Sequence, residues 1–187
     1  MSIKSLSIST LDNPKFVKPI RINYIQDEKE LSWEAVKSHD SVAVLLYHKE
    51  KDSFLLVKQF RPPVYVNDNS YRFTYELCAG IIDKECSLKQ IVKEEIDEEC
   101  GYDVSLKDIT KITSFFTNVG VSGSKQHLFY AQIDESMKVH EGGGIDTESI
   151  ELFFLHVSEA KEFIFDESRA KTPGLMFAFY WFFDKNS

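Results

Sequence analysis

The helix predicted to begin after Ser87 is the feature that most limits what this chain can fold into. Ser87 and Gln90 match a capping box, and Gly101 stands where a left-handed cap ends a helix, so both ends fix the register. At about 100° per residue, Glu95 and Glu99 then lie inside the apolar stripe of the helix instead of opposite it. Burying carboxylates without a partner is costly, so the pattern indicates that something cationic neutralises them.

Two interpretations of these glutamates follow from the residues themselves. A run of acidic side chains is most often a solvated helix face, where repulsion between neighbouring turns costs only a few tenths of a kcal/mol per pair. The fixed register argues against that interpretation, because Glu95 and Glu99 cannot easily turn toward water. Mg²⁺ or Mn²⁺ is the natural partner, since carboxylate oxygens are the ligands that Mg²⁺ prefers.

Composition limits the classes of protein and partner. The 187 residues are 43% apolar, which is enough for the core of one domain with a small appendage. A net charge of −8 argues against binding nucleic acid, whose phosphates need a basic surface. No signal peptide is evident, and the longest apolar run, residues 174–183, is too short to cross a membrane. The three cysteines contain no CxxC pair, which favours a reducing compartment and a cytoplasmic protein.

Strand and helix patterns are mixed along the chain without an internal repeat, which predicts an α+β protein. Residues 41–47 and 53–60 are strong strand candidates joined by a turn, so they are expected to pair as a hairpin. Ser158 is expected to cap a helix that ends near residue 164, and Thr172 to cap a buried terminal helix. Further strands are predicted at residues 20–24, 71–77, 109–116, 126–133 and 150–157, with a strand or irregular segment at 33–37.

An acidic, glycine-rich loop is predicted at residues 141–148, between the last two strands. Three consecutive glycines indicate mobility, and mobile loops often close over a site. An exposed connection explains the same composition equally well. If the loop does close, Asp146 and Glu148 bring two more carboxylates to the site.

These residues resemble a known family. Gly80 and the acidic helix match most of the Nudix box, Gly-x5-Glu-x7-Arg-Glu-U-x-Glu-Glu-x-Gly-U, in which U is an apolar residue. The matching positions are Gly80, Glu95, Glu98, Glu99, Gly101 and Tyr102. Outside the box, similarity to the UDP-sugar pyrophosphatase branch, which is close to the ADP-ribose pyrophosphatases, is found in segments 39–62, 76–80 (ELCAG), 98–102 (EECGY), 120–130 and 142–151.

Two positions depart from the box. Cys86 stands where the first glutamate is usual, with Glu85 one residue earlier. Glu94 stands where the arginine is usual, with Lys93 one residue earlier. In the family that arginine helps to orient a metal-binding glutamate, so an acid there adds repulsion where an ion pair is expected. Because the metal carboxylates are retained, the resemblance implies a weakened but active enzyme in preference to a binding module that has lost turnover.

The resemblance also implies a fold and an activity. The fold is the Nudix fold, a mixed β-sheet sandwiched between helices in residues 41–187. A small N-terminal β region, residues 1–40, is expected to form a homodimer with the sites near the interface. The implied activity is metal-dependent hydrolysis of the pyrophosphate bond of nucleoside diphosphate sugars. UDP-glucose is the preferred substrate, giving UMP and glucose 1-phosphate, and ADP-ribose is the alternative.

By the same resemblance, the metal ligands are the main-chain carbonyl of Ala79 and the carboxylates of Glu95, Glu98, Glu99 and Glu148. Glu148 is also the expected base, with Asp146 as the alternative, while Glu98 assists.

Four further residues are candidates for substrate binding. Arg61, Arg72 and Lys125 carry charges suited to phosphate oxygens, and each could equally belong to a surface ion pair. Trp33 could stack on a base, although lone aromatic residues more often belong to the core.

Overall fold

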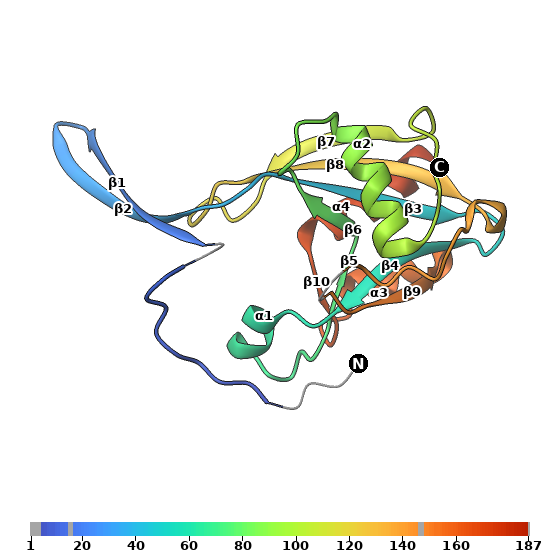
Figure 1. Ribbon diagram of the computed structural model, residues 1–187, viewed down its shortest axis with the longest axis horizontal. Coiled ribbons are helices and arrows are strands. Elements are labelled where there is room, and N and C mark those ends of the chain that lie inside the picture. The colour runs from blue at the N-terminus through green and yellow to red at the C-terminus, as the bar shows by residue number, and fades with distance from the viewer. Residues whose placement is uncertain (1–4, 15–16, 146–147, 187) are drawn as a thin grey trace.

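The computed structural model describes residues 5–14, 17–145 and 148–186 (Figure 1). The strands of its main sheet are β3 (Ser41–His48), β4 (Ser53–Gln59), β5 (Thr74–Glu76), β6 (Cys78–Ile81), β7 (Thr110–Phe116), β8 (Lys125–Ile133), β9 (Ile150–His156) and β10 (Ala170–Lys171). Within the described residues these eight strands run in the order β10, β5, β4, β3, β8, β7, with β6 paired to β3 and β9 paired to β4. Parallel and antiparallel pairs both occur, so the expected mixed sheet is confirmed.

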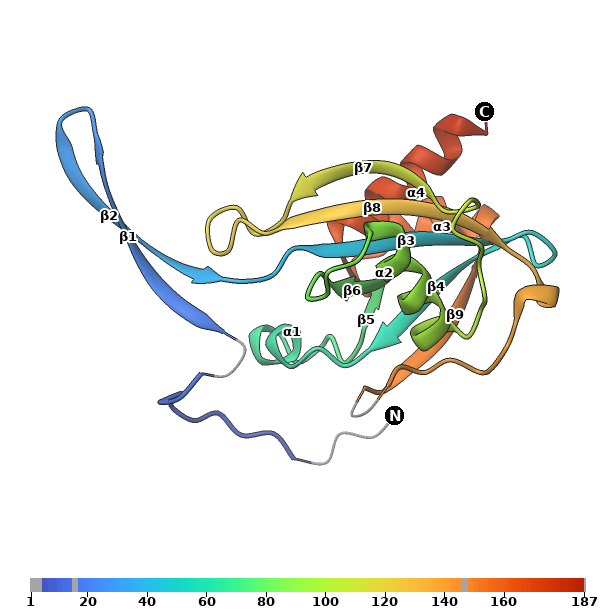
Figure 2. The same ribbon diagram turned by 45° about the horizontal axis from the view of Figure 1, so that its top comes forward.

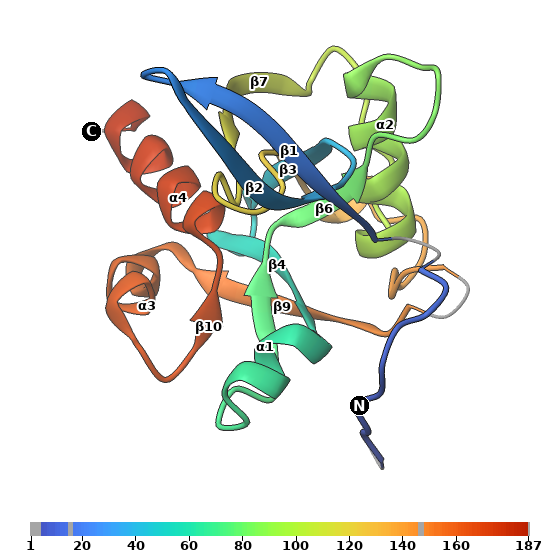
Figure 3. The ribbon, with the colours of Figure 1, turned by 90° about the vertical axis from the view of Figure 1, so that its left-hand side faces the viewer.

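Helices cover both faces of this sheet, as Figure 3 shows. One face is covered by α2 (Leu88–Glu95), which continues as a π-helical turn over Ile96–Cys100. The other face is covered by α3 (Ala160–Phe165) and α4 (Pro173–Lys185). The expected α+β sandwich is therefore confirmed. Because successive strand side chains point to opposite faces, β3 serves both cores, with Val42, Val44 and Leu46 on the α2 side and Ala43 and Leu45 on the α4 side.

β3 and β4 begin as the predicted hairpin and then part. Beside the turn, residues 46–48 pair with residues 53–55 in antiparallel register. Farther along, the first half of β3 pairs with β6, and the last three residues of β4 pair with β5. Since β5 and β6 are separated in the chain by Leu77 alone, residues 74–81 fill the gap between the parting strands and bring β6 against α2.

One segment forms a shorter strand than the sequence predicts, and another forms a helix that the sequence does not predict. The strand predicted over 71–77 is only the short β5, because the chain turns at Leu77 to pair with a different neighbour. α1 (Pro62–Asn67) is unpredicted; two prolines begin it and none of its residues is buried, so it lacks an apolar stripe. The segment at 33–37, predicted as strand or irregular, belongs to a longer strand.

Of the caps predicted for the last two helices, one is wrong and one is confirmed. The prediction that Ser158 caps α3 is wrong, because Ser158 lies inside a 3₁₀ turn, with its N–H bonded to His156 Nδ1, and α3 begins only at Ala160. Thr172 does cap α4, since its Oγ1 accepts the Leu175 N–H at 3.3 Å. No helix in the described part of the chain is both long and apolar enough to cross a membrane.

β1 (Lys18–Gln26) and β2 (Lys29–Lys37) form a separate two-stranded sheet that projects from the body (Figures 1 and 2). We call this hairpin the arm. Its two strands pair in antiparallel register over their whole length. Near the base of the arm, Trp33 Nε1 donates a hydrogen bond to the Gly120 carbonyl oxygen at 2.9 Å. The arm is thus joined to the loop that precedes β8.

Candidate active site

The predicted metal ligands meet in one cavity of about 500 Å³, which we call the acidic cavity. It lies at the end of β4 and the start of β3, where these strands have parted. All five predicted metal ligands line it, namely Ala79, Glu95, Glu98, Glu99 and Glu148. The other lining residues are Ser41, Gln59, Arg61, Glu76, Gly80, Ile81, Asp83, Lys84, Gln126 and Ile145.

The acidic helix has the ends that its sequence predicts. Ser87 caps it, with its Oγ accepting the Gln90 N–H at 3.2 Å. Gly101 ends it in the left-handed region, with a φ of 77°. The last turn is π-helical, a form found frequently at functional sites. With the register fixed at both ends, Glu95 and Glu99 both line the acidic cavity.

Glu99 is the most deeply buried acid of the cavity, with 4% of its surface exposed. Its Oε2 accepts the Ala79 N–H at 3.0 Å. Burial raises the pKa of Glu99 to about 8, and the charges of Glu95 and Glu148 add to the effect. Burial, with repulsion from Glu98 and Glu148, raises the pKa of Glu95 to about 7. The protein's own groups leave these carboxylates poorly neutralised, so the donor set fits a divalent cation.

Gly80 allows the acidic helix to approach β6 closely. A Cβ atom at this position would lie 1.8 Å from Glu95 Oε1, far inside van der Waals contact. Only glycine therefore leaves the Glu95 carboxylate where it is. This gives a physical reason for the glycine that begins the box motif.

Two of the three glycines of the acidic loop join it to the end of the acidic helix. Gly143 and Gly144 donate their N–H groups to the carbonyl oxygens of Glu99 and Glu98, at 2.9 and 3.1 Å. All three glycines have positive φ, with values of 67°, 114° and 84° along the chain. Gly143 and Gly144 thereby satisfy carbonyl groups that a helix end otherwise leaves open, while the Gly142 N–H donates to His140 Nδ1 at 3.0 Å. The glycines thus have a docking role besides the mobility that their composition predicts.

After these glycines the chain brings Glu148 to the acidic cavity. Glu148 is exposed, and its Oε2 accepts the Ile145 N–H at 3.1 Å. Its carboxylate is close enough to raise the pKa of both Glu95 and Glu99. The alternative base, Asp146, lies outside the described residues.

Arg61 is the predicted substrate-binding residue that reaches the cavity. Its guanidinium forms a bidentate ion pair with Glu76, at 2.8 and 2.9 Å. Thr74 Oγ1 donates a further hydrogen bond to Glu76 Oε1 at 2.5 Å. The hydrogen bonds with Glu76 raise the pKa of Arg61, and the charges of Glu99 and Glu148 raise it further. Arg61 is therefore both a member of an ion pair and, like Lys84, a cation that lines the cavity beside its acids.

Comparison with known proteins assigns the family. No family model matches the chain. Uridine diphosphate glucose pyrophosphatase NUDT14 of Bos taurus is 32% identical over 209 residues, covering 97% of this chain and 94% of that protein. The protein of the same name from Mus musculus is 30% identical over 98% of this chain and 95% of its own length. GDP-mannose pyrophosphatase of Cronobacter sakazakii is 37% identical over 66% of this chain and 63% of that protein. This chain belongs to the Nudix family of sugar-nucleotide pyrophosphatases.

The acid at the usual arginine position of the Nudix box has a cation of its own. Lys84 Nζ donates to Glu94 Oε2 at 2.9 Å, and Gln90 Nε2 donates to Glu94 Oε1 at 3.0 Å. These bonds lower the pKa of Glu94. Lys93 does not substitute, because its ammonium group pairs with Asp103 instead. The repulsion expected at Glu94 is thus replaced by an ion pair with Lys84, a cavity residue that no motif predicts.

The other three candidates for substrate binding are not among the described residues that line the acidic cavity. Arg72 is exposed, with its guanidinium 5.6 Å from the centre of the Phe73 ring. Lys125 Nζ lies 5.1 Å from the centre of the Phe116 ring. Trp33 lies on the arm. Unpredicted polar residues line the acidic cavity in their place, namely Ser41, Gln59, Glu76, Asp83 and Gln126.

A second group of possible ligands lies at the opposite end of β3 from the acidic cavity. Single donor atoms of His48, Glu50 and Glu135 all lie within 4.8 Å of one another. Lys51 Nζ already pairs with Glu135 Oε2 at 3.1 Å, and the Lys51 N–H donates to His48 Nδ1 at 3.4 Å. Glu135 Oε2 also lies 3.4 Å from His48 Nε2, so both ring nitrogens already face groups of the protein. We interpret this group as an ion-pair cluster.

Proposed function

We propose that this protein hydrolyses the pyrophosphate bond of nucleoside diphosphate sugars in a metal-dependent reaction. UDP-glucose is the preferred substrate, and UMP and glucose 1-phosphate are the products. The observation that carries the proposal is the acidic cavity, where Glu148 and three Nudix-box carboxylates converge and two of the pKa values are raised. Clustered acids with raised pKa values in a cavity are typical of a functional site.

Glu95, Glu98 and Glu99 are the side chains that would hold Mg²⁺ or Mn²⁺, together with the main-chain carbonyl of Ala79. When bound, such an ion screens the phosphate oxygens and acidifies water. The protein prepares this donor set in advance, because the Ala79 N–H holds the Glu99 carboxylate and Gly80 leaves space for that of Glu95. Little rearrangement is then needed when a cation enters.

Two charged residues act on the substrate in this proposal. Arg61 binds phosphate oxygens, for which the forked guanidinium is suited, and Glu76 keeps that fork oriented. Glu148 takes the proton of the attacking water, with Asp146 as the alternative base and Glu98 assisting. The exposure of Glu148 supports this role, since a base near the mouth can exchange its proton with solvent.

The preference for UDP-glucose rests on how much of the chain is matched. The relatives named for UDP-glucose align with nearly all of it, including the arm, whereas the relative named for GDP-mannose aligns with about two thirds. GDP-mannose is therefore the second candidate substrate, and ADP-ribose remains an alternative from the family resemblance.

The arm supports the proposal of a homodimer. One of its faces is apolar, because the register places Ile20 opposite Ala35, Ile22 opposite Trp33 and Tyr24 opposite Leu31. The five large side chains of this face are each at least 37% exposed. A lone two-stranded hairpin is marginally stable in water, so a second copy that covers this face stabilises both arms. The free state of Cys78, Cys86 and Cys100 in turn supports a location in the reducing cytoplasm.

A turnover screen tests the activity. UDP-glucose, GDP-mannose and ADP-ribose are each supplied with Mg²⁺, Mn²⁺ or excess EDTA, and the release of nucleoside monophosphate is measured. We expect the highest kcat/KM with UDP-glucose and no turnover in EDTA. Full activity in EDTA contradicts the metal assignment, and a higher kcat/KM for another substrate contradicts the substrate assignment. If the protein binds UDP-glucose but does not hydrolyse it, the result supports the alternative interpretation, a binding module that has lost turnover.

Two matched lysine variants test the dimer. Ile22→Lys puts a charge on the apolar face of the arm, and Asn23→Lys puts the same charge on the opposite face. By light scattering, we expect Ile22→Lys to be monomeric and Asn23→Lys to remain dimeric. A monomeric wild-type protein with normal activity removes the dimer from the proposal.

A further inference from the structure

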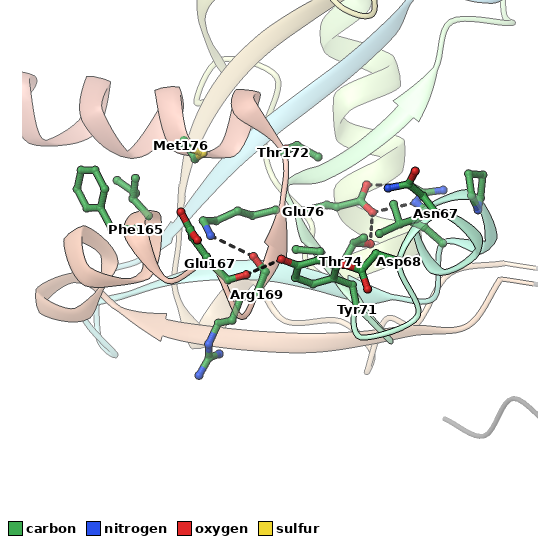
Figure 4. A pocket seen from close by; sticks show the side chains of 16 residues that line it. Asn67, Asp68, Tyr71, Thr74, Glu76, Phe165, Glu167, Arg169, Thr172 and Met176 are labelled. Atoms are coloured by element: carbon green, nitrogen blue, oxygen red, sulfur yellow. Dashed lines mark hydrogen bonds and ion pairs between the residues drawn. The ribbon is translucent and has the colours of Figure 1, made fainter.

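A second cavity adjoins the acidic cavity and shares Arg61 and Glu76 with it. We call it the side cavity; its volume is about 870 Å³. Figure 4 shows its labelled residues: Asn67 lies near Glu76 on one side, and Met176 and Phe165 lie on the other. The two cavities meet at the Arg61–Glu76 ion pair, so a ligand whose phosphates contact Arg61 can extend into either of them.

The charges that line the side cavity balance. It has three basic and three acidic residues, namely Arg61, Arg169, Lys171, Asp68, Glu76 and Glu167. Beyond Arg61, which faces the acidic cavity, both remaining cations are engaged: Arg169 by Asp166 at 3.0 Å, and Lys171 by the carbonyl oxygens of Asp166 and Arg169 at 2.6 and 3.0 Å. A phosphate group deeper in the side cavity would have to displace one of these partners. The balance of charge therefore favours an uncharged ligand.

The groups still available in the side cavity suit hydroxyl groups. Among the described residues, neither the Asn67 amide nor the Glu167 carboxylate has a hydrogen-bond partner, and both residues are exposed. A carboxylate accepts hydrogen bonds, and an amide both donates and accepts them. Met176 and Ile164 add apolar surface to the lining. Hydroxyl groups and a C–H face are the two kinds of surface that a hexose offers to such a lining.

We propose that the side cavity binds the hexose of the nucleoside diphosphate sugar. This inference rests on the proposed function, because it places the sugar beside a diphosphate held at the acidic cavity and Arg61. Glu167 and Asn67 contact hydroxyl groups, and Met176 packs against the ring. The sugar is then selected by a region of the chain separate from the metal carboxylates, built from α1, the segment between α3 and α4, and the start of α4.

Adjacent residues of α4 give a matched test. Met176 lines the side cavity, whereas Phe177 does not and is 47% exposed. Met176→Trp fills space that the hexose needs, so we expect KM for UDP-glucose to rise about tenfold or more. The affinity for UDP, which has no sugar, should stay unchanged when titrated by calorimetry with Mg²⁺. Phe177→Trp should change neither value.

A second pair keeps the test decisive if Met176→Trp does not fold. Asn67→Ala removes a proposed sugar contact, and Asn69→Ala is an exposed control outside the lining. We expect Asn67→Ala alone to raise KM for UDP-glucose, by about threefold to tenfold, with UDP affinity unchanged. An unchanged KM, or an equal loss of UDP affinity, overturns the sugar assignment while leaving the proposed function intact. A wild-type protein that neither turns over UDP-glucose nor binds UDP overturns both.

Discussion

Replacement of Glu99 by glutamine removes the most deeply buried carboxyl group of the acidic cavity. Burial raises the pKa of this carboxyl from an ordinary 4.5 to about 8, so at pH 7 the folded protein holds a proton that the unfolded chain releases. Each pH unit above 4.5 then lowers the free energy of unfolding by about 1.4 kcal/mol, so the loss of stability at pH 7 is about 3 kcal/mol. Without metal, the free energy of unfolding therefore falls as pH rises from about 4.5 to about 8.

Glu99→Gln avoids this cost because glutamine carries no charge. Its amide oxygen can still accept the Ala79 N–H, but its NH₂ group carries two N–H donors where the protonated carboxyl carries one O–H. Allowing about 1 kcal/mol for that imperfect replacement, we expect the metal-free variant to be about 2 kcal/mol more stable than wild type at pH 7. At pH 4 the advantage should vanish, since Glu99 is then protonated in both states.

Urea unfolding in EDTA at pH 4 and pH 7 measures this difference. Glu94→Gln is the matched control on the same helix; because Lys84 lowers the pKa of Glu94, its loss should slightly destabilise the protein at pH 7. Addition of Mg²⁺ should then stabilise wild type and Glu94→Gln but not Glu99→Gln. The reasoning is refuted if metal-free Glu99→Gln is no more stable than wild type at pH 7, or if its advantage persists at pH 4.

Three other changes have definite expected outcomes. Gly80→Ala places a Cβ 1.8 Å from Glu95 Oε1, so kcat should fall about tenfold or more with the circular dichroism spectrum retained; normal turnover contradicts this placement. Glu148→Gln should lower kcat far more than it changes KM, and equal small effects remove Glu148 from the role of base. Asp134, whose pKa the Lys49 ion pair lowers to about 2, contributes stability that is lost as pH falls from about 4 toward 2. The urea midpoints of wild type and Asp134→Asn should therefore converge over that range, and a constant difference contradicts the ion pair.

Local rules in the sequence predicted the acidic helix, its two ends and the inward placement of its glutamates. The Ser87 cap involves an N–H only three residues away, and the apolar stripe repeats with each helical turn, so both can be identified without the fold. Gly101 ends the helix for an equally local reason, its left-handed backbone. Glu95 and Glu99 accordingly line a cavity, as their place in the stripe predicts. Where a local rule failed, as at Ser158, a short turn competed for the same residues.

The tertiary structure decided which charges meet. Arg61 and Arg72 are alike in sequence, yet only Arg61 stands beside the parting of β3 and β4 and reaches the acidic cavity. Lys84 and Glu94 are ten residues apart, and the lysine that adjoins Glu94 in sequence turns to Asp103 instead. Ion pairs of this kind leave no periodic signal, because any of the 22 lysines and arginines could neutralise an acid that it can reach. The packed chain selects among them, since strand pairing and burial fix which side chains are close and shielded enough from water to interact strongly.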